Sequence, residues 1–279
     1  MPTHTDCAVV VLAAGAGTRM KSTKQKTLHE IGGRTLLSHA LHAAAGISPE
    51  HIVAVVGHQR DQVSPAVDAV AAELDRPVLQ AVQEEQNGTG HAVQCGLEPI
   101  PDFDGAVIVT NGDVPLLTAE TLRRLLDAHT SSPTAVTVLT MRLDDPTGYG
   151  RIVRNEDGEV TAIVEQKDGT PEQLQITEVN SGVFAFDGAI LRDALGKLDS
   201  NNAQGELYLT DVLGIARAAG AEVALTEQIS TDPDIIERVS TADSVLGLGT
   251  SFGDDSEFTW RTRTAATGVQ LPGGGHEVF

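Results

Sequence analysis

A short loop after an apolar segment carries the residue types that bind phosphate groups. Residues 9–12 are four consecutive apolar residues, as in a buried strand, and the small residues after them cannot continue a packed strand. Gly15 and Gly17 permit positive φ angles and allow a ligand to approach the backbone closely. Backbone amides in such a loop form a nest for phosphate. Four cationic side chains follow, namely Arg19, Lys21, Lys24 and Lys26.

The loop does not match the best-known nucleotide-binding motifs. Its Gly-x-Gly-Thr-Arg-Met order lacks the third glycine of the dinucleotide fingerprint, and the chain contains no Gly-x-x-x-x-Gly-Lys-Ser/Thr sequence. The alternative interpretation is an ordinary turn whose lysines are solvated. Because the whole chain is strongly acidic, a cluster of one arginine and three lysines favours a phosphate site.

Asp113 is the main candidate for a metal ligand. It follows the apolar segment 106–110 within the sequence Asn-Gly-Asp-Val-Pro. Mg²⁺ takes one or two carboxylates and leaves room for substrate oxygens, so a carboxylate at a strand end that faces phosphates suits it. The alternative is a turn-forming aspartate before Pro115. The histidines lack zinc-ligand spacing, and no Ser-His-Asp or Cys-His set indicates covalent catalysis.

Charge limits the classes of partner. The chain has 279 residues, of which 39 are acidic and 19 basic, and its formal net charge is -20 at pH 7. Such a surface repels nucleic acids and anionic membranes, so neither is expected as a partner. An anionic small substrate therefore needs a local basic site, which residues 19–26 supply.

Targeting signals and cysteines indicate the compartment. Residues 1–7 lack the basic and apolar regions of a signal peptide, and no apolar run approaches the roughly 20 residues of a membrane span. Cys7 and Cys95 have neither disulfide-framework nor metal-ligand spacing, and are expected to be core thiols. We therefore expect a soluble protein of the cytoplasm.

The order of apolar segments predicts an α/β fold with an aliphatic core. Apolar strands without polar alternation, interleaved with helical patterns, indicate βαβ units and a sheet covered on both faces. We expect a Rossmann-like, mostly parallel sheet with strands at 9–12, 51–57, 77–82, 106–110 and 136–141. Residues 152–154 and 160–164 predict an inserted β-hairpin, of the kind that forms a lid or a second substrate wall. An extended segment at 178–186 and helices near 188–198 and 207–218 follow.

The loops at 13–26, 83–90 and 111–115 all leave the carboxyl ends of predicted strands. In open parallel sheets the ligand lies in the crevice beyond these ends, so the three loops can converge on one nucleotide-sized site. The residues alone leave the roles of Glu165 and Asn180 open. The polar run 201–208 is explained by helix capping as well as by binding.

Several linked motifs between residues 7 and 228 closely resemble one family. It is the uridylyltransferase domain of the bacterial bifunctional N-acetylglucosamine-1-phosphate uridylyltransferase/glucosamine-1-phosphate acetyltransferase. The motifs are Leu12-Ala-Ala-Gly-x-Gly-Thr-Arg-Met-x-Ser, Lys26-x-Leu-His29, Gln83-x-x-x-x-Gly88-Thr-Gly-His-Ala, Gly112-Asp-Val-Pro-Leu, Leu143-Asp-Asp-Pro-Thr-Gly-Tyr-Gly-Arg-Ile, Ile163-Val-Glu, Val179-Asn and Asn201-Asn-Ala-Gln-Gly-Glu-Leu-Tyr-Leu-Thr-Asp211.

The resemblance implies a fold of the nucleotide-diphospho-sugar transferase type and a role for each matching residue. Uridylyl transfer from UTP to N-acetylglucosamine 1-phosphate would give UDP-N-acetylglucosamine, a cell-wall precursor, and pyrophosphate. Arg19 and Lys26 would contact the triphosphate, and Asp113 would bind Mg²⁺. The uridine, ribose and phosphates would contact Leu12, Ala13, Ala14, Gly15, Gln83, Gly88, Thr89, Asn111, Gly112 and Asp113. The N-acetylglucosamine moiety would contact Gly150, Glu165 and Asn180.

Three features depart from the family pattern. Gln25 stands where the family usually has proline before the lysine, which is expected to loosen the loop. Ser240 stands where the family has an asparagine that is a second Mg²⁺ ligand. The hexapeptide repeats of the acetyltransferase half do not follow residue 228. Since the family's trimer contacts come largely from that half, a monomer or weak oligomer is expected.

These departures suggest a boundary between two parts of the chain and leave more than one function open. We expect a nucleotidyltransferase domain at 1–229 and a divergent, poorly ordered tail at 230–279, which an out-of-frame reading of a longer gene would explain. Resequencing of the gene tests that explanation. The active Mg²⁺-dependent enzyme is the preferred hypothesis. The alternatives are a binding-only or weakly active remnant and a nucleotidyltransferase for another sugar phosphate.

Overall fold

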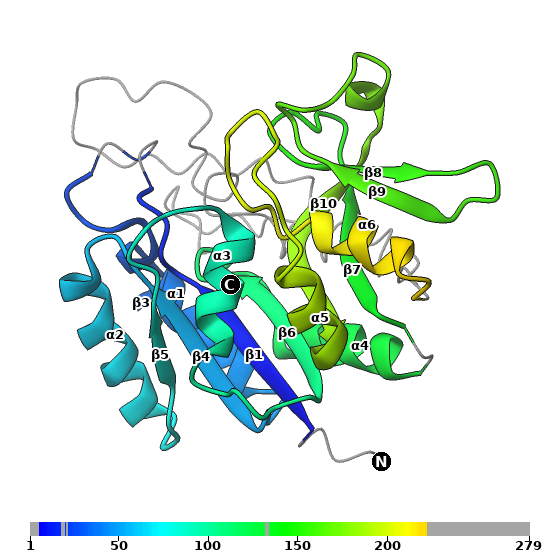
Figure 1. Cartoon of the computed structure of the whole chain (residues 1–279). Helices are drawn as coiled ribbons and strands as arrows, with labels where there is room; N and C mark the ends of the chain where they lie inside the picture. Colours follow the sequence, from blue (N-terminus) through cyan, green and yellow to red (C-terminus); the bar gives the residue numbers. More distant parts are fainter. Residues whose placement is uncertain (1–5, 18–19, 21, 132–133, 222–279) are drawn as a thin grey trace, which may run out of the picture.

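A computed structural model describes residues 6–17, 20, 22–131 and 134–221 of the chain. Its central strand, β1 (Cys7–Leu12), lies between β4 (His51–Val56) and β6 (Ala106–Asn111) and runs parallel to both (Figure 1). The short strand β5 (Leu79–Val82) extends the parallel part beyond β4. The described sheet has eight strands, and the mostly parallel α/β fold is confirmed. The tail expected at 230–279, with Ser240, lies outside the described residues.

Beyond β6 the sheet becomes antiparallel. Strand β10 (Glu178–Asp187) lies between β6 and β7 (Val136–Arg142) and runs opposite to both. The sequence predicts a strand at β7 and an extended segment at 178–186. It does not predict that this extended segment, β10, lies between β7 and β6. A run of apolar residues is equally suited to either strand direction, so its neighbours are set by tertiary packing.

The predicted hairpin is present as β8 (Arg151–Arg154) and β9 (Val160–Val164). Its turn is closed by Asn155, whose Oδ1 accepts from Glu159 N at 2.8 Å, and by Gly158 at a positive φ of 82°. The hairpin joins the sheet through one register pair, Val179 of β10 with Arg151 of β8. It therefore projects from the sheet beside the first residues of β10.

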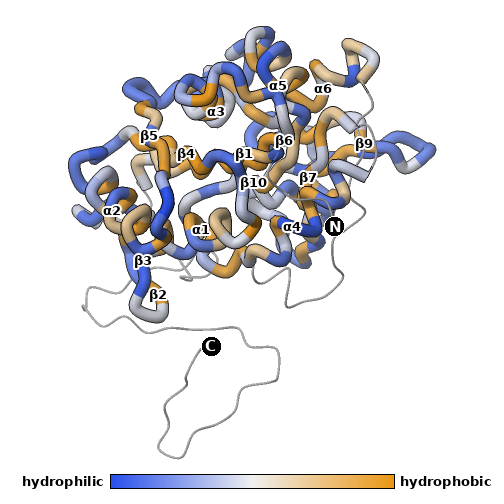
Figure 2. Tube along the Cα trace, turned by 90° about the horizontal axis from the view of Figure 1, so that it is seen from below, coloured by the Kyte–Doolittle hydropathy of each residue, from blue (hydrophilic) through white to orange (hydrophobic). Residues whose placement is uncertain are grey.

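Helices cover both faces, as predicted, because β1 is apolar on both sides. Val9 and Val11 pack in one core with α1 (Leu36–Ala45), α2 (Arg60–Glu73) and α4 (Ala119–Thr130). Ala8 and Val10 pack in the other core with α3 (Thr89–Leu97), α5 (Gly188–Leu195) and α6 (Asp211–Ala218). Figure 2 shows the two rows of helices on either side of the sheet. Among the described helices, none is long and apolar enough to cross a membrane.

Short elements complete the described chain. A small hairpin, β2 (Glu30–Ile31) with β3 (Arg34–Thr35), precedes α1, and Thr35 caps that helix by accepting from Ser38 N at 3.1 Å. Two 3₁₀ turns, η2 (Lys26–Leu28) and η3 (Gln173–Gln175), lie in loops. Helix α6 begins at Asp211 and not near residue 207, because Leu207 and Leu209 bond through their backbone to α3.

A buried carboxylate ties together the strands where the sheet changes direction. Glu178 on β10 receives two hydrogen bonds from Arg154 of β8, at 2.7 and 2.9 Å, and one from Thr140 of β7 at 3.1 Å. Burial alone would raise the pKa of Glu178, but its bonds and charge interaction with Arg154 hold that pKa below its usual value. Glu178 therefore stabilises the junction of three strands as a carboxylate.

We predict that Glu178→Gln lowers the free energy of unfolding by about 2 kcal/mol at pH 7, since the charge of the half-exposed Arg154 loses its partner. Because the folded-state pKa is lowered, the wild-type advantage is complete above the unfolded-state pKa of Glu178, and is lost as the pH falls through the folded-state value. Urea unfolding at several pH values measures this. Glu120→Gln, in an exposed pair with Arg123, is the control and is expected to cost less than about 0.5 kcal/mol. Equal losses in both variants would contradict the prediction.

Candidate functional site

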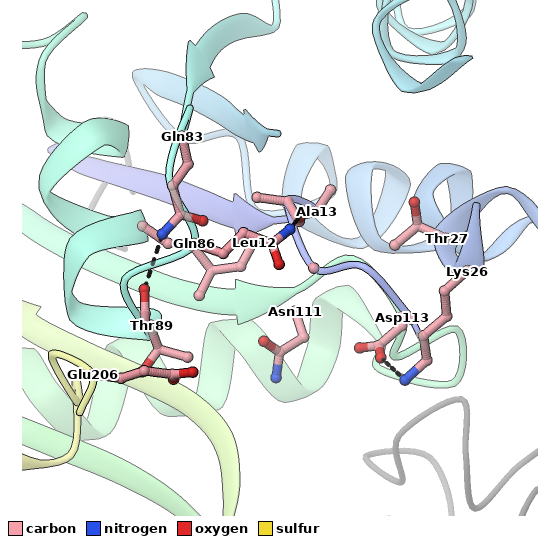
Figure 3. Close-up of a pocket in the computed structure, with 15 residues that line it drawn as sticks. Leu12, Ala13, Lys26, Thr27, Gln83, Gln86, Thr89, Asn111, Asp113 and Glu206 are labelled. Carbon is pink, nitrogen blue, oxygen red and sulfur yellow. Dashed lines mark hydrogen bonds and ion pairs between the residues drawn. The ribbon is translucent and has the colours of Figure 1, made fainter. Parts of the chain in front are cut away.

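The three predicted loops meet at one cavity of about 410 Å³ at the carboxyl ends of the parallel strands. Figure 3 shows Lys26 and Asp113 at one end of this pocket, Gln83, Thr89 and Glu206 at the other, and Asn111 between them. The lining residues are Leu12, Ala13, Ala14, Gly15, Gly17, Lys26, Thr27, Gln83, Gln86, Gly88, Thr89, Ala92, Asn111, Asp113 and Glu206. Convergence of these loops is therefore confirmed.

The glycine loop begins in register with its neighbours. Ala13 N donates to Val55 O at 2.8 Å, and Gly112 N donates to Leu12 O at 2.8 Å. Gly17 has a φ of 57°, and a Cβ there would lie 2.6 Å from the Cβ of Lys26, so this position requires glycine. Gly15 lines the pocket without a positive φ. Arg19 lies outside the described residues.

Lys26 and Asp113 form an ion pair at the end of the pocket. Lys26 Nζ lies 2.6 Å from Asp113 Oδ2, and both side chains are largely buried, with 12% and 17% of their surfaces exposed. A partly buried pair is screened less than a surface pair. One cation and one carboxylate therefore face the same space, where an anionic ligand can take the first and a metal ion the second.

The opposite end of the pocket is built by the second glycine loop. Gln83 is almost fully buried and its Nε2 donates to Gly88 O at 3.0 Å. Gly88 has a φ of 100°, and a Cβ there would lie 2.5 Å from Leu207 O. Thr89 Oγ1 accepts from Leu209 N at 3.0 Å. The segment 201–210 thus packs directly against the start of α3.

That packing brings Glu206, which was not among the predicted site residues, into the pocket. Gln86 and Thr27 also line the pocket without having been predicted. The polar run 201–208 is the signal for Glu206, but helix capping explained it equally well. Gly112, which was predicted to bind, is not in the lining: a Cβ there would lie 3.2 Å from both Ala13 Cβ and Leu12 O, so it allows close packing behind the loop.

Gly150, Glu165 and Asn180 come together in a second cluster, which we call the hairpin cluster. Asn180 N donates to Gly150 O at 2.9 Å, and a Cβ on Gly150 would lie 3.3 Å from Glu165 Oε1. None of the three lines the first pocket. They adjoin it through Gly182, whose N donates to Asn180 Oδ1 at 2.9 Å and whose Cβ position lies 2.6 Å from Asn111 Nδ2.

A buried arginine supports the hairpin cluster. Arg151, 1% exposed, donates to Tyr149 O and to Gln166 Oε1, the second at 2.9 Å. The same Gln166 oxygen accepts from Gly148 N at 3.0 Å. These bonds connect the loop that contains Gly150 to the residue that follows Glu165, so both sides of the cluster are held by one guanidinium.

Glu165 is in an unfavourable environment for a charge. Burial raises its pKa, and the nearby Asp211 and Asp168 raise it further, while a 3.3 Å hydrogen bond from Thr210 Oγ1 acts in the opposite direction. A carboxylate that folding makes harder to ionise lowers stability wherever it is ionised. Perturbed groups of this kind concentrate at functional sites.

Gln25 makes hydrogen bonds that the sequence does not predict. It was expected to loosen the loop by replacing proline, but its φ of −59° lies in the range of proline and its side chain is buried and hydrogen-bonded. These bonds offset the missing ring constraint.

Comparison with known proteins identifies a family whose domain includes most of the pocket and part of the hairpin cluster. The profile of the MobA-like NTP transferase domain matches residues 9–168. The bifunctional protein GlmU of Corynebacterium aurimucosum is 71% identical over 245 residues, which cover 88% of this chain and 50% of that protein. GlmU of Rhodococcus opacus is 63% identical over 227 residues, covering 80% of this chain and 45% of the relative. The chain spans about half the length of the curated relatives it matches.

A solved structure shares the fold. The crystal structure of UDP-glucose pyrophosphorylase complexed with UDP-glucose superposes with a TM-score of 0.62, covering 84% of this chain and 97% of the other, at 17% identity. The apo form of UDP-glucose pyrophosphorylase gives the same TM-score at 16% identity. Identities this low support likeness of fold alone.

We predict that Glu165→Gln raises the melting temperature at pH 7 to 8, because a neutral amide replaces a carboxylate whose ionisation opposes folding. With its folded-state pKa raised, wild-type stability falls as the pH rises through that value, so the gain of the variant shrinks toward acidic pH. Thermal unfolding at several pH values measures the difference. Exposed Glu156 supplies the control, and Glu156→Gln is expected to change stability by less than about 0.5 kcal/mol. A variant less stable than wild type at pH 8 would contradict the prediction.

Proposed function

The chain belongs to the MobA-like NTP transferase domain family, and from this we propose that it transfers a uridylyl group from UTP to N-acetylglucosamine 1-phosphate, which yields UDP-N-acetylglucosamine and pyrophosphate. The observation that carries the proposal is the Lys26–Asp113 pair at the end of a nucleotide-sized pocket that adjoins the hairpin cluster. The GlmU relatives and the family resemblance support the choice of nucleotide and sugar.

The nucleotide lies along the pocket, with its uridine and its phosphates at opposite ends. Gln83, Gly88 and Thr89 contact the uridine at one end, and the glycine loop, Leu12 to Gly15, contacts the nucleotide from the side, between the uridine and the phosphates. Lys26 and Arg19 contact the triphosphate at the other end. The arrangement in Figure 3 supports this orientation, since amide and hydroxyl groups lie opposite the ammonium group. Gly150, Glu165 and Asn180 contact the N-acetylglucosamine moiety.

Asp113 suits a magnesium ion that is held together with substrate phosphates. Asp113 supplies one carboxylate at this end of the pocket, and the described residues contain no group of three or more His, Cys, Asp and Glu side chains that could hold a metal ion. That fits Mg²⁺, which takes one or two carboxylates and completes its coordination with water and phosphate oxygens. Bound there, Mg²⁺ supplies positive charge that neutralises the phosphates.

The reaction needs no protein nucleophile. An oxygen of the sugar phosphate forms a bond to the α-phosphorus of UTP as the bond to the β-phosphate breaks, and pyrophosphate leaves. The protein's contribution is to position the two substrates and to stabilise charge through Lys26 and Arg19.

The compartment proposed for this activity is the cytoplasm. Support comes from Cys7 and Cys95, both of which are present as buried thiols.

We predict that pyrophosphate release from UTP and N-acetylglucosamine 1-phosphate requires Mg²⁺ and that Lys26→Met lowers kcat/KM about 100-fold or more, because a charge-stabilising group is lost. Asp113→Asn is expected to have a similar effect at limiting Mg²⁺. Lys24→Met is the matched control: although Lys24 belongs to the predicted cationic cluster, it is exposed, pairs with Glu30 and does not line the pocket, so its loss should change kcat/KM less than about threefold.

Two outcomes of this assay oppose the proposal. Full activity of Lys26→Met would exclude its role at the phosphates. No release of pyrophosphate by wild type, with UDP-N-acetylglucosamine still bound, would favour the binding-only alternative.

We predict that Asn180→Ser raises the KM for N-acetylglucosamine 1-phosphate about tenfold and leaves the KM for UTP within twofold, since the side-chain amide lies in the hairpin cluster and not in the nucleotide pocket. Serine keeps an oxygen that can accept from Gly182 N. Initial rates with each substrate varied in turn measure both constants. A panel with glucose 1-phosphate tests the alternative acceptor, and a preference of wild type for it would contradict the proposed sugar.

A further inference from the structure

Three consecutive carbonyl groups of the glycine loop, those of Ala13, Ala14 and Gly15, accept hydrogen bonds from protein donors. Gln25 Nε2 donates to Gly15 O at 2.9 Å and to Ala13 O at 3.5 Å. Between these two carbonyls, Ala14 O accepts from Gln86 Nε2 at 2.6 Å and from His58 N at 3.2 Å. Bare carbonyl oxygens repel a phosphate. A loop whose carbonyls are bonded to donors therefore presents a less negative surface to an anion.

The hydrogen bonds to these carbonyl groups also fix the direction of the backbone N–H groups in the same peptides. In a trans peptide the C=O and N–H groups point in opposite directions, and the described chain contains no cis peptide bond. With Ala13 O and Gly15 O directed at Gln25, the amides of Ala14 and Ala16 point to the side away from it. Within the described chain, neither amide donates a hydrogen bond, so both are available for an anion.

The other end of the Gln25 side chain controls the segment that presents Lys26. Gln25 Oε1 accepts from Thr27 N at 2.6 Å and from Thr27 Oγ1 at 2.5 Å, and so caps η2, in which Lys26 is the first residue. The backbone amide of Thr27 can only donate and the two loop carbonyls can only accept, so the partners determine the orientation of the Gln25 amide. One side chain thus fixes both the loop amides and the turn that carries the cation.

Gln25 acts from behind the loop. It is 2% exposed and does not line the pocket, so a ligand there does not touch it. We propose that Gln25 is a positioning residue for the triphosphate group: it orients the peptides between Ala13 and Ala16 and the Lys26 turn as one anion-binding unit. This inference rests on the proposed function, because that function supplies the triphosphate.

The test uses Gln25→Met, which keeps the length and neutral charge of the side chain and removes its hydrogen bonds. We expect at least a tenfold loss of affinity for inorganic triphosphate in calorimetric titration and at least a tenfold rise in the KM for UTP, with the KM for the sugar phosphate within twofold of wild type. Gln94→Met is the matched control, because Gln94 also donates to a backbone carbonyl, Leu195 O at 2.8 Å, outside the pocket. It is expected to leave all three values within twofold.

The outcomes separate this inference from the proposed function. Unchanged triphosphate affinity in Gln25→Met, an equal loss in Gln94→Met, or no binding of inorganic triphosphate to wild type would each overturn it. Failure of wild type to release pyrophosphate from UTP would instead contradict the proposed reaction. If Gln25→Met does not fold, ¹⁵N spectra of wild type decide: shifts of the Ala14 and Ala16 amides on adding inorganic triphosphate support the inference, and unchanged amides overturn it.

Discussion

The in-register ends of the parallel strands are the constraint on which the rest of the site depends. Leu12 pairs with Val55 and with Asn111, and Val56 pairs with Val82. Because these pairs end at one level, the next backbone amides continue the ladders, with Ala13 N bonded to Val55 O, Gln83 N to Val56 O and Gly112 N to Leu12 O. Three loops that are distant in sequence therefore start side by side. A shift of one residue in any ladder would move its loop by a full residue and turn its side chains to the opposite face.

The reversal of the sheet at β10 completes the site. Since β10 runs antiparallel to β6, its beginning and not its end lies beside Asn111. The register shifts between Asn180 and Val183, and Ser181 supports this bulge by donating to Leu139 O at 2.6 Å and accepting from Val183 N at 3.2 Å. The bulge places Gly182 against Asn111, which brings the hairpin cluster next to the pocket. An all-parallel sheet would have left that cluster without an attachment at this edge.

Much of this arrangement could be predicted from the sequence, and the exceptions have physical reasons. Uninterrupted apolar runs mark buried strands, so the strand ends, the convergence of Lys26 with Asp113 and the inserted hairpin were all predictable. The place of β10 was not, because apolar residues fit either strand direction. Glu206 was not predicted because its position depends on tertiary contacts. Leu207 and Leu209 hydrogen-bond to the start of α3, so this segment stays outside α6 and Glu206 faces the pocket. The role of Gln25 depends on which carbonyls its amide reaches, and residue type alone does not contain that information.

The single register pair between β8 and β10 has an evolutionary consequence. The pocket end of the site is held by three continuous parallel ladders, so most backbone changes there disturb the centre of the sheet. The hairpin with Gly150 shares little backbone pairing with that centre and is anchored mainly by side chains such as Glu178 and Arg151. Changes of length or sequence in the hairpin therefore cost the sheet little. A lineage with this fold can therefore vary the residues of the hairpin cluster while the half that forms the pocket stays nearly constant.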